Sequence, residues 1–198
     1  MEKFILNYYR SSTFNVCEHQ ELPMMSGPPH ELHIDQNVKP TAIHNPMPIP
    51  LHWKEEVKRQ FDMDERLGVI EKVPVGELVT WLSWLVVASK KNRKLRWTVD
   101  LQKLNATALR ETHHTPSPFN QAMSIPNDKL KTTFDAWNGY HSVPIRKSDR
   151  DYNSFLTEWG RYHYRVAPQG YATSGDRYTQ RRHRKQNMVH RRHGAMGR

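Results

Sequence analysis

The spacing of apolar residues predicts an amphipathic helix near residue 60. Charged and polar side chains fill most of the segment 53–67, and the apolar positions fall four or six residues apart, near one face of a helix. Those positions are Trp53, Val57, Phe61 and Leu67. Gly68 follows directly, and glycine often ends a helix. We therefore expect a helix over about 53–67 that buries this face.

A run of β-branched and aromatic residues then predicts a hairpin. Residues 84–88 and 94–99 both favour strand, and the polar segment 90–93 between them suits a turn. Positive charge is concentrated on this turn and on the start of its second strand, at Lys90, Lys91, Arg93, Lys94 and Arg96. A hairpin with a basic tip is therefore expected.

Weaker patterns predict four further elements. They are a helix between Pro118 and Pro126, a short buried strand at 130–134, and two strands at 152–158 and 162–166 joined by Trp159-Gly160-Arg161. Upstream, seven prolines between residues 23 and 50 disfavour helices and central strands, because proline fixes φ and has no N–H. Residues 1–50 should be extended, and no period of 2 or 3.6 is visible beyond Gln180.

Composition and charge divide the chain into a body and a basic tail. Apolar residues make up 36% of the 198 residues, below the ~45–50% of a compact domain, so part of the chain should not pack. The net charge is +10, but residues 177–198 hold eight basic residues and no acidic one. That leaves 22 basic against 20 acidic residues in 1–176, so the excess charge belongs to the tail.

Other residue types exclude several classes of protein. The single cysteine, Cys17, cannot form an internal disulfide, and zinc sites with four cysteines or with two cysteines and two histidines are excluded. The twelve histidines form no cluster with ligand spacing and supporting carboxylates. No apolar run suits a signal-peptide core or the ~20 residues of a membrane span. We expect an intracellular protein, cytoplasmic or nuclear, that is not secreted and has no membrane partner.

Three short motifs could carry chemistry, and each also has an ordinary structural explanation. The basic hairpin tip could hold a phosphate or be a solvated turn. In F-D-A-W-N-G-Y (134–140) an acid precedes an aromatic ring by five residues, although Asp135 could instead cap a helix. In P-Q-G (168–170) the glycine could let a ligand approach the backbone beside Gln169, or form a plain turn. Their order along the chain is far more restrictive than any one of them.

In this order the motifs resemble the fingers and first palm segments of reverse transcriptases from gypsy-type LTR retrotransposons and retroviruses. The resemblance covers roughly three quarters of the chain, about residues 33–178. It rests on L-G-V-I-E (67–71), V-A-S-K-K-N-R-K-L-R-W-T-V-D-L-Q-K-L-N (87–105), T-F-D-A-W-N-G-Y-H-S-V-P-I (133–145) and W-G-R-Y-H-Y-R-V-A-P-Q-G-Y (159–171). It implies an α+β fold, with a mixed fingers subdomain followed by the start of a palm, between irregular ends.

The resemblance also implies roles for individual residues. Asp135 matches the first catalytic aspartate, which would bind the Mg²⁺ ions of a two-metal nucleotidyl transfer. Tyr140 matches the steric gate that excludes the 2′-hydroxyl of a ribonucleotide. The other implied positions bind the nucleotide (Lys91, Arg96, Gln169 and Gly170) or the nucleic acid (Lys90, Arg93 and Lys94).

One part of the reverse-transcriptase pattern is missing. The second acidic motif, an aromatic or cysteine and one variable residue before Asp-Asp, does not occur, and no acid follows Asp176. Two divalent ions need several carboxylates, so we expect this chain alone to be inactive. One permitted codon set for residues 188–197, read one nucleotide downstream, gives Trp-Cys-Ile-Asp-Asp-Thr-Val-Leu-Trp, which resembles the missing motif. A frameshifted tail and an unrelated basic tail both stay open.

Three functions are consistent with the sequence. The chain could be an RNA-directed DNA polymerase module of a longer Pol polyprotein, with primer-template and deoxynucleotides as partners. It could instead be a non-catalytic nucleic-acid-binding remnant that grips phosphates, or a decayed open reading frame. The expected domains are a Pro-containing lead-in at 1–32, which could be a post-protease connector, a partial reverse transcriptase domain at 33–178, and a basic disordered tail at 179–198.

Overall fold

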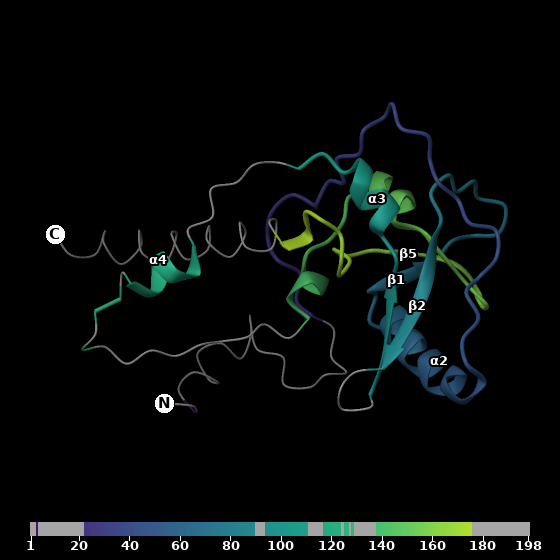
Figure 1. Ribbon diagram of the computed structural model, residues 1–198, viewed down its shortest axis with the longest axis horizontal. Coiled ribbons are helices and arrows are strands. Elements are labelled where there is room, and N and C mark those ends of the chain that lie inside the picture. Colours follow the sequence, from purple (N-terminus) through teal and green to yellow (C-terminus); the bar gives the residue numbers. More distant parts are fainter. Residues whose placement is uncertain are drawn as a thin grey trace.

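The computed structural model describes residues 22–89, 94–110, 117–123 and 138–175, together with Lys3, Ile125, Pro126 and Asp128. At its centre is a five-stranded sheet (Figure 1), in which the strand order is β1-β5-β4-β2-β3. The strands are β1 (Ile70–Lys72), β2 (Ser83–Ser89), β3 (Leu95–Val99), β4 (Phe155–Thr157) and β5 (Gly160–Tyr164). Neighbouring strands are antiparallel, except that β2 and β4 are parallel. Together with the helices, this sheet confirms the α+β class.

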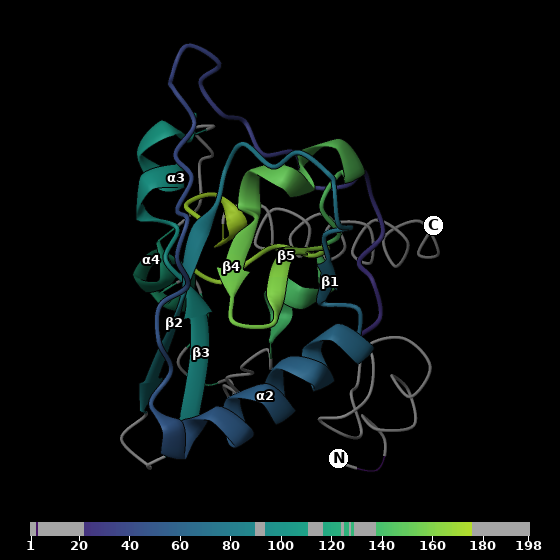
Figure 2. The same ribbon diagram turned by 90° about the vertical axis from the view of Figure 1, so that its right-hand side faces the viewer.

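Helix α2 (Leu51–Arg66) is the predicted amphipathic helix and begins two residues earlier than expected. Val57 and Phe61 are fully buried, and the two outer apolar positions of the predicted face pack at the edge of the core. Gly68, with φ +68°, adopts the left-handed conformation that glycine tolerates after a helix end. Figure 2 shows α2 crossing one face of the sheet, where it contacts β3 and β1.

Aromatic rings fill the space between α2 and the sheet. The ring of Phe61 meets Tyr162 edge-on, with 4.7 Å between centroids, and lies 5.2 Å from the Trp97 ring. Phe155 of the central strand β4 lies 6.1 Å from Phe61 and is also fully buried. Truncating a buried phenylalanine to alanine costs about 3–5 kcal/mol, so this cluster is a main source of stability for the contact of α2 with the sheet.

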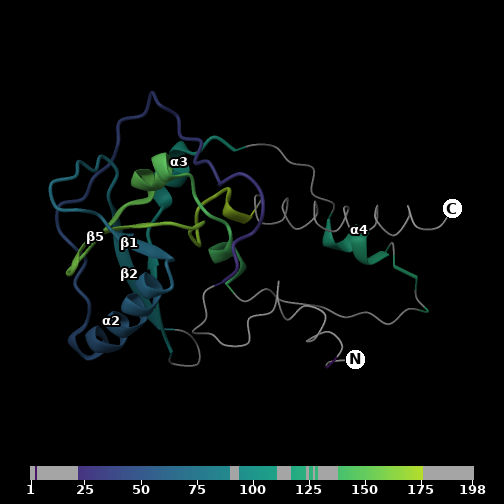
Figure 3. The same cartoon turned by 180° about the vertical axis from the view of Figure 1, so that it is seen from behind.

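The β2–β3 hairpin pairs as predicted, from Leu85 opposite Val99 to Ser89 opposite Leu95, while its tip at 90–93 lies outside the described residues. Among the described residues the fold also contains the short helices α3 (Gln102–Thr107) and α4 (Pro118–Met123) and the 3₁₀ helices η1 (Gly139–Ser142) and η2 (Lys147–Asn153). Helix α4 is the one expected between Pro118 and Pro126. It lies apart from the sheet in Figures 1 and 3. The strand expected at 130–134 lies outside the described residues.

The second predicted hairpin forms, but its bounds were wrong. Residues 152 and 153 end η2 instead of starting a strand, and β4 begins at Phe155. The reason is Asn153, whose fully buried side chain accepts a hydrogen bond from Tyr164 N at 2.6 Å and donates to Tyr164 O at 3.4 Å. These side-chain bonds replace backbone pairing. The other strand, β5, starts at Gly160, two residues earlier than predicted.

The proline-containing segment 22–50 is extended, as expected, and it also packs along the domain. Single bridges join Ile34 to Ala108 and Ala42 to Leu82, and Leu32 is among its buried side chains. Its apolar residues occur singly or in pairs between prolines and polar residues, so no sequence period revealed this packing. The boundary at residue 32 stays a prediction, and the tail at 179–198 lies outside the described residues. None of the helices described is long and apolar enough to cross a membrane.

Candidate functional site

A pocket of about 160 Å³ opens on the side of the sheet that α2 covers. Its walls come from segments that are far apart in the chain. They include Asp64 of α2, Arg96 of β3, His141 of η1, Tyr164 of β5 and Gln169, which follows β5. Two of the predicted nucleotide-binding residues, Arg96 and Gln169, therefore meet in one pocket.

Of the other predicted site residues, the structure describes Tyr140, Gly170 and Lys94. Tyr140 precedes the pocket residue His141 in η1, and its hydroxyl lies close to Gly175, where an added Cβ would be 3.6 Å from Tyr140 Oη. Gly170 has φ +94°, which suits glycine, and Lys94 is exposed immediately before β3. The remaining predicted site residues, Asp135, Lys90, Lys91 and Arg93, lie outside the described residues. The roles assigned to all of these residues stay predictions.

Asn105 of α3 fixes the loop that follows Gln169. Its Nδ2 donates to Gly170 O at 2.7 Å, and its Oδ1 accepts from Ala172 N at 2.9 Å. Because both ends of the amide are engaged, its orientation is defined and it holds the loop against α3. Asn105 ends one of the family-like segments, but no local pattern indicates that its side chain reaches residues 170–172.

Asp64 is the carboxylate of the pocket, and sequence reasoning did not single it out. Its Oδ2 accepts a hydrogen bond from Trp97 Nε1 at 3.0 Å. Burial raises the pKa of Asp64 to about 6, although the indole bond acts in the opposite direction. The pKa of the buried Tyr164 hydroxyl is raised by burial and by Asp64 and lowered by Arg96, so all three groups share one electrostatic environment.

His141 contributes no positive charge to this pocket at neutral pH. Burial lowers the pKa of its imidazole to about 4, because the charged form loses hydration there. Among the described lining residues, Arg96 is therefore the cation and Asp64 the anion. The pocket is close to neutral when Asp64 is ionised and positive when Asp64 is protonated.

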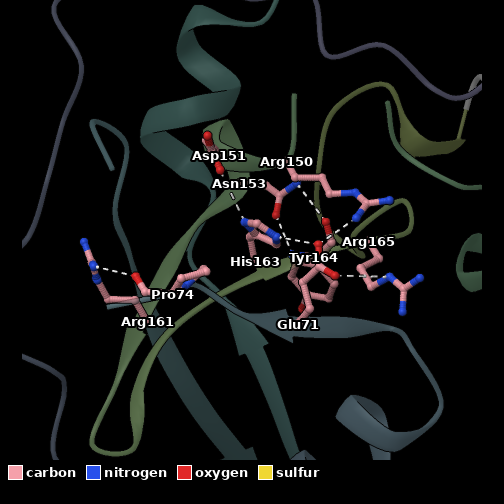
Figure 4. Close-up of polar contacts among 9 residues, drawn as sticks. All are labelled: Glu71, Pro74, Arg150, Asp151, Asn153, Arg161, His163, Tyr164 and Arg165. Carbon is pink, nitrogen blue, oxygen red and sulfur yellow. Dashed lines mark hydrogen bonds and ion pairs between the residues drawn. The ribbon is translucent and has the colours of Figure 1, made fainter. Parts of the chain in front are cut away.

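Figure 4 shows a separate polar cluster around Glu71 and His163. His163 neighbours the pocket residue Tyr164 in β5, so the two side chains lie on opposite faces of the sheet. Glu71 Oε1 accepts from Arg150 at 2.6 Å and lies 2.8 Å from His163 Nε2, and Arg165 Nε lies 3.4 Å from Glu71 Oε2. On its other side, His163 Nδ1 is 3.4 Å from Asp151 Oδ1. Burial would raise the pKa of Glu71, but the bonds from His163 and Arg150 outweigh it and hold this pKa below its usual value. The cluster ties β1, β5 and η2 together.

The described residues do not supply the metal site that the resemblance implies. They contain no group of three or more His, Cys, Asp or Glu side chains that could hold a metal ion. Asp149 Oδ2 accepts from Leu32 N at 3.0 Å, and Asp151 faces His163, so these two carboxylates are engaged elsewhere. The donors in this part of the chain therefore do not fit a two-metal centre, and Mg²⁺ stays a proposal.

Comparisons with known proteins place this fold. No protein-family model matches the chain. A stretch of 79 residues, 40% of the chain, is 29% identical to the retrovirus-related Pol polyprotein from transposon gypsy of Drosophila melanogaster and covers 8% of it. The native prototype foamy virus protease-reverse transcriptase matches with a TM-score of 0.74 and 21% identity, over 90% of this chain and 23% of that one. The foamy viral protease-reverse transcriptase in complex with an RNA/DNA hybrid matches with a TM-score of 0.74 and 20% identity, over 89% and 23%.

The chain thus has a reverse-transcriptase-like fold, and 40% of it is similar in sequence to the gypsy Pol polyprotein, which agrees with the resemblance that the order of its motifs predicted. It spans 8% of the gypsy Pol polyprotein and 23% of the native foamy virus protein. At 21% identity, the structural match establishes the fold.

Proposed function

We propose that the chain is the fingers and opening palm portion of a reverse transcriptase, and that its pocket holds the phosphates of a deoxynucleoside triphosphate beside an RNA or DNA primer-template. The observation that carries this proposal is the meeting of Arg96 and Gln169 in one pocket, beside the η1 helix that contains Tyr140. These three residues come from three separate motifs of the resemblance.

The chemistry of these side chains suits the proposed ligand. The Arg96 guanidinium is planar and permanently charged, and it can make paired hydrogen bonds to phosphate oxygens. Gln169 can both donate to and accept from a sugar or base. The ring of Tyr140 would exclude a ribose 2′-hydroxyl. Solved foamy viral relatives carry an RNA/DNA hybrid or double-stranded DNA, which supports nucleic acid as the second partner.

In this proposal the chain by itself does not synthesise DNA. Template-directed deoxynucleotidyl transfer with Mg²⁺ would belong to a longer Pol polyprotein in the cytoplasm or nucleus, in which further carboxylates join Asp135. The fragment would keep the binding functions and lack the complete metal site. A nucleic-acid-binding remnant without nucleotide binding is the alternative that the experiments below separate.

Calorimetric titration with thymidine triphosphate tests the nucleotide site. Arg96→Ala and Gln169→Ala should each weaken binding about tenfold, a loss of about 1.4 kcal/mol. Lys147→Ala is the matched control, because it also removes an exposed side chain but lies on η2. Equal weakening by Lys147→Ala, or no binding by the wild-type chain, would contradict the proposal.

Binding of a labelled RNA/DNA hybrid and primer extension test the remaining points. Binding should weaken steeply with salt, because its contacts are basic side chains on phosphates. No labelled deoxynucleotide should be incorporated with Mg²⁺. Extension that Asp135→Asn abolishes would show that this chain assembles an active metal site. Hybrid binding without triphosphate binding would instead favour the non-catalytic remnant.

A further inference from the structure

Asp64 is an unexpected residue in a pocket that is proposed to hold phosphates. It is the one carboxylate among the described residues that line this pocket, and Arg96 is the one guanidinium. An ionised carboxylate beside a bound phosphate repels it, and the repulsion is larger in a half-buried pocket than in water, because the effective dielectric constant is lower. The protonation state of Asp64 should therefore control how well the pocket accepts an anion.

The neighbours of Asp64 leave both protonation states possible. From β3, Trp97 donates its indole N–H to Asp64 Oδ2, a bond that a carboxyl group can accept whether ionised or protonated. The charged or titratable groups that face the pocket from the other elements are Arg96 of β3, Tyr164 of β5 and His141 of η1, and the uncharged Gln60 and Gln169 complete the polar lining. Tyr164 keeps its proton, because burial raises the pKa of its hydroxyl. His141 stays neutral above about pH 4, because burial lowers its pKa to about that value.

We propose that Asp64 couples anion binding in this pocket to the uptake of a proton, so that a phosphate-bearing ligand binds when the Asp64 carboxyl group is protonated and is repelled when it is ionised. This inference rests on the proposed function, since it takes this pocket as the phosphate site. Asp64 acts as a positioning and gating group and takes no part in the chemistry of nucleotide transfer.

Because Asp64 is partly buried, its carboxyl group should change protonation state close to neutral pH. Burial raises its pKa to about 6, so the carboxyl group is ionised at pH 8 and largely protonated at pH 5.5. Anion affinity should therefore rise as the pH falls across this range. By thermodynamic linkage, a bound anion must also raise the pKa of Asp64.

The test uses the 198-residue chain with sulfate as the first probe, because sulfate stays dianionic between pH 5.5 and pH 8, and with thymidine triphosphate as the second. Wild-type affinity for sulfate should rise about tenfold from pH 8 to pH 5.5, a size typical of coupling between neighbouring sites. Asp64→Asn keeps an acceptor for Trp97, and it should bind at pH 8 as tightly as the wild type binds at pH 5.5, with little further change. Asp62→Asn, on the exposed side of α2, is the control and should keep the wild-type profile.

A second measurement covers the case in which Asp64→Asn does not fold. The carboxyl carbon resonance of Asp64 in the labelled wild-type chain reports its titration midpoint, and sulfate should move this midpoint to higher pH. A midpoint that sulfate leaves unchanged, or a wild-type affinity that is flat with pH while triphosphate binding still depends on Arg96, overturns the inference and leaves the proposed function standing. Absence of sulfate and triphosphate binding in both the wild type and Asp64→Asn, at both pH values, overturns both.

Discussion

On one face of the sheet, the Glu71 carboxylate is surrounded by Arg150, His163 and Arg165, and its pKa lies below the usual value. On the α2 face, the Asp64 carboxylate is bonded by the neutral indole of Trp97, and burial raises its pKa to about 6. Both side chains are partly removed from water. Burial raises the pKa of both carboxyl groups. Cationic hydrogen-bond donors outweigh this effect at Glu71, whereas the neutral indole donor does not outweigh it at Asp64.

Strand β5 separates these two environments. Its neighbouring residues His163 and Tyr164 point to opposite faces, as alternate residues of a strand do, and His163 reaches Glu71 while Tyr164 lines the pocket of Asp64. The face that holds Glu71 suits a structural role, because the charge of this carboxylate is balanced by Arg150 and Arg165. On the other face, the hydrogen-bond donor to the Asp64 carboxylate is a neutral indole, so its charge is not balanced by that bond. Such a carboxylate suits a site whose protonation state changes when a ligand binds.

The largest effect on stability should come from removing the carboxylate of Glu71, which is paired with Arg150. Glu71→Ala leaves the largely buried His163 and Arg150 without their acceptor and should lower the free energy of unfolding by about 2 kcal/mol at pH 7. This is less than the loss of a fully buried pair, because 36% of the Glu71 side chain is exposed to solvent. Urea unfolding measures it. Glu56→Ala, which removes an exposed helical ion pair with Arg59, should cost far less, and equal costs would contradict the comparison.

Asp64→Asn should raise the free energy of unfolding, whereas Glu71→Ala lowers it. The pKa of Asp64 is higher in the folded chain than its ordinary value of 3.8, so ionisation opposes folding, and stability falls as the pH rises from about 4 to about 6. The asparagine variant escapes this loss and should be more stable than the wild type by about 1–2 kcal/mol at pH 8, below the ceiling set by about 1.4 kcal/mol per unit of pKa shift. Urea unfolding at pH 8 and pH 4 should show the gain at the higher pH and its disappearance at the lower one.

The contribution of Glu71 to stability should depend on pH in the opposite direction. Its folded pKa is lowered, so its ionised form contributes stability above the unfolded pKa of about 4.3, and this contribution is lost as the pH falls through the folded value. Glu71→Gln keeps an acceptor oxygen, and we expect a deficit of about 1 kcal/mol at pH 6 that shrinks below about pH 4. A deficit that is constant from pH 6 to pH 3 would show that charge is not its cause.

The smallest effect concerns the indole that bonds Asp64. Trp97→Phe removes this donor and should raise the pKa of Asp64 by about half a unit, the equivalent of about 0.7 kcal/mol. Carboxyl carbon NMR across pH 4–8 measures the shift. Trp84→Phe is the matched control, because the Trp84 indole donates to Asn45 O, and it should leave the Asp64 titration unchanged.

The sequence by itself determined the elements in which apolar residues recur regularly. Val57 and Phe61 marked the buried face of α2, and the β-branched and aromatic runs on either side of the polar segment 90–93 marked the β2–β3 hairpin. The order of the motifs along the chain was enough to predict the reverse-transcriptase-like fold. These features are encoded locally, in residue spacing and in motif order.

Only the tertiary structure decided what lies beside each polar group. The side chain of Asn153 bonds the backbone of Tyr164 and so ends η2 where a strand was predicted, and Asn105 holds the Gly170 loop from a distant helix. Asp64 follows Phe61 by three residues and so lies on the buried face of α2, but only the fold shows that Arg96 lines the same pocket. Spacing along the chain indicates which face of an element a residue occupies. The charge, the hydrogen bonds and the burial on that face come from segments that fold against it from elsewhere.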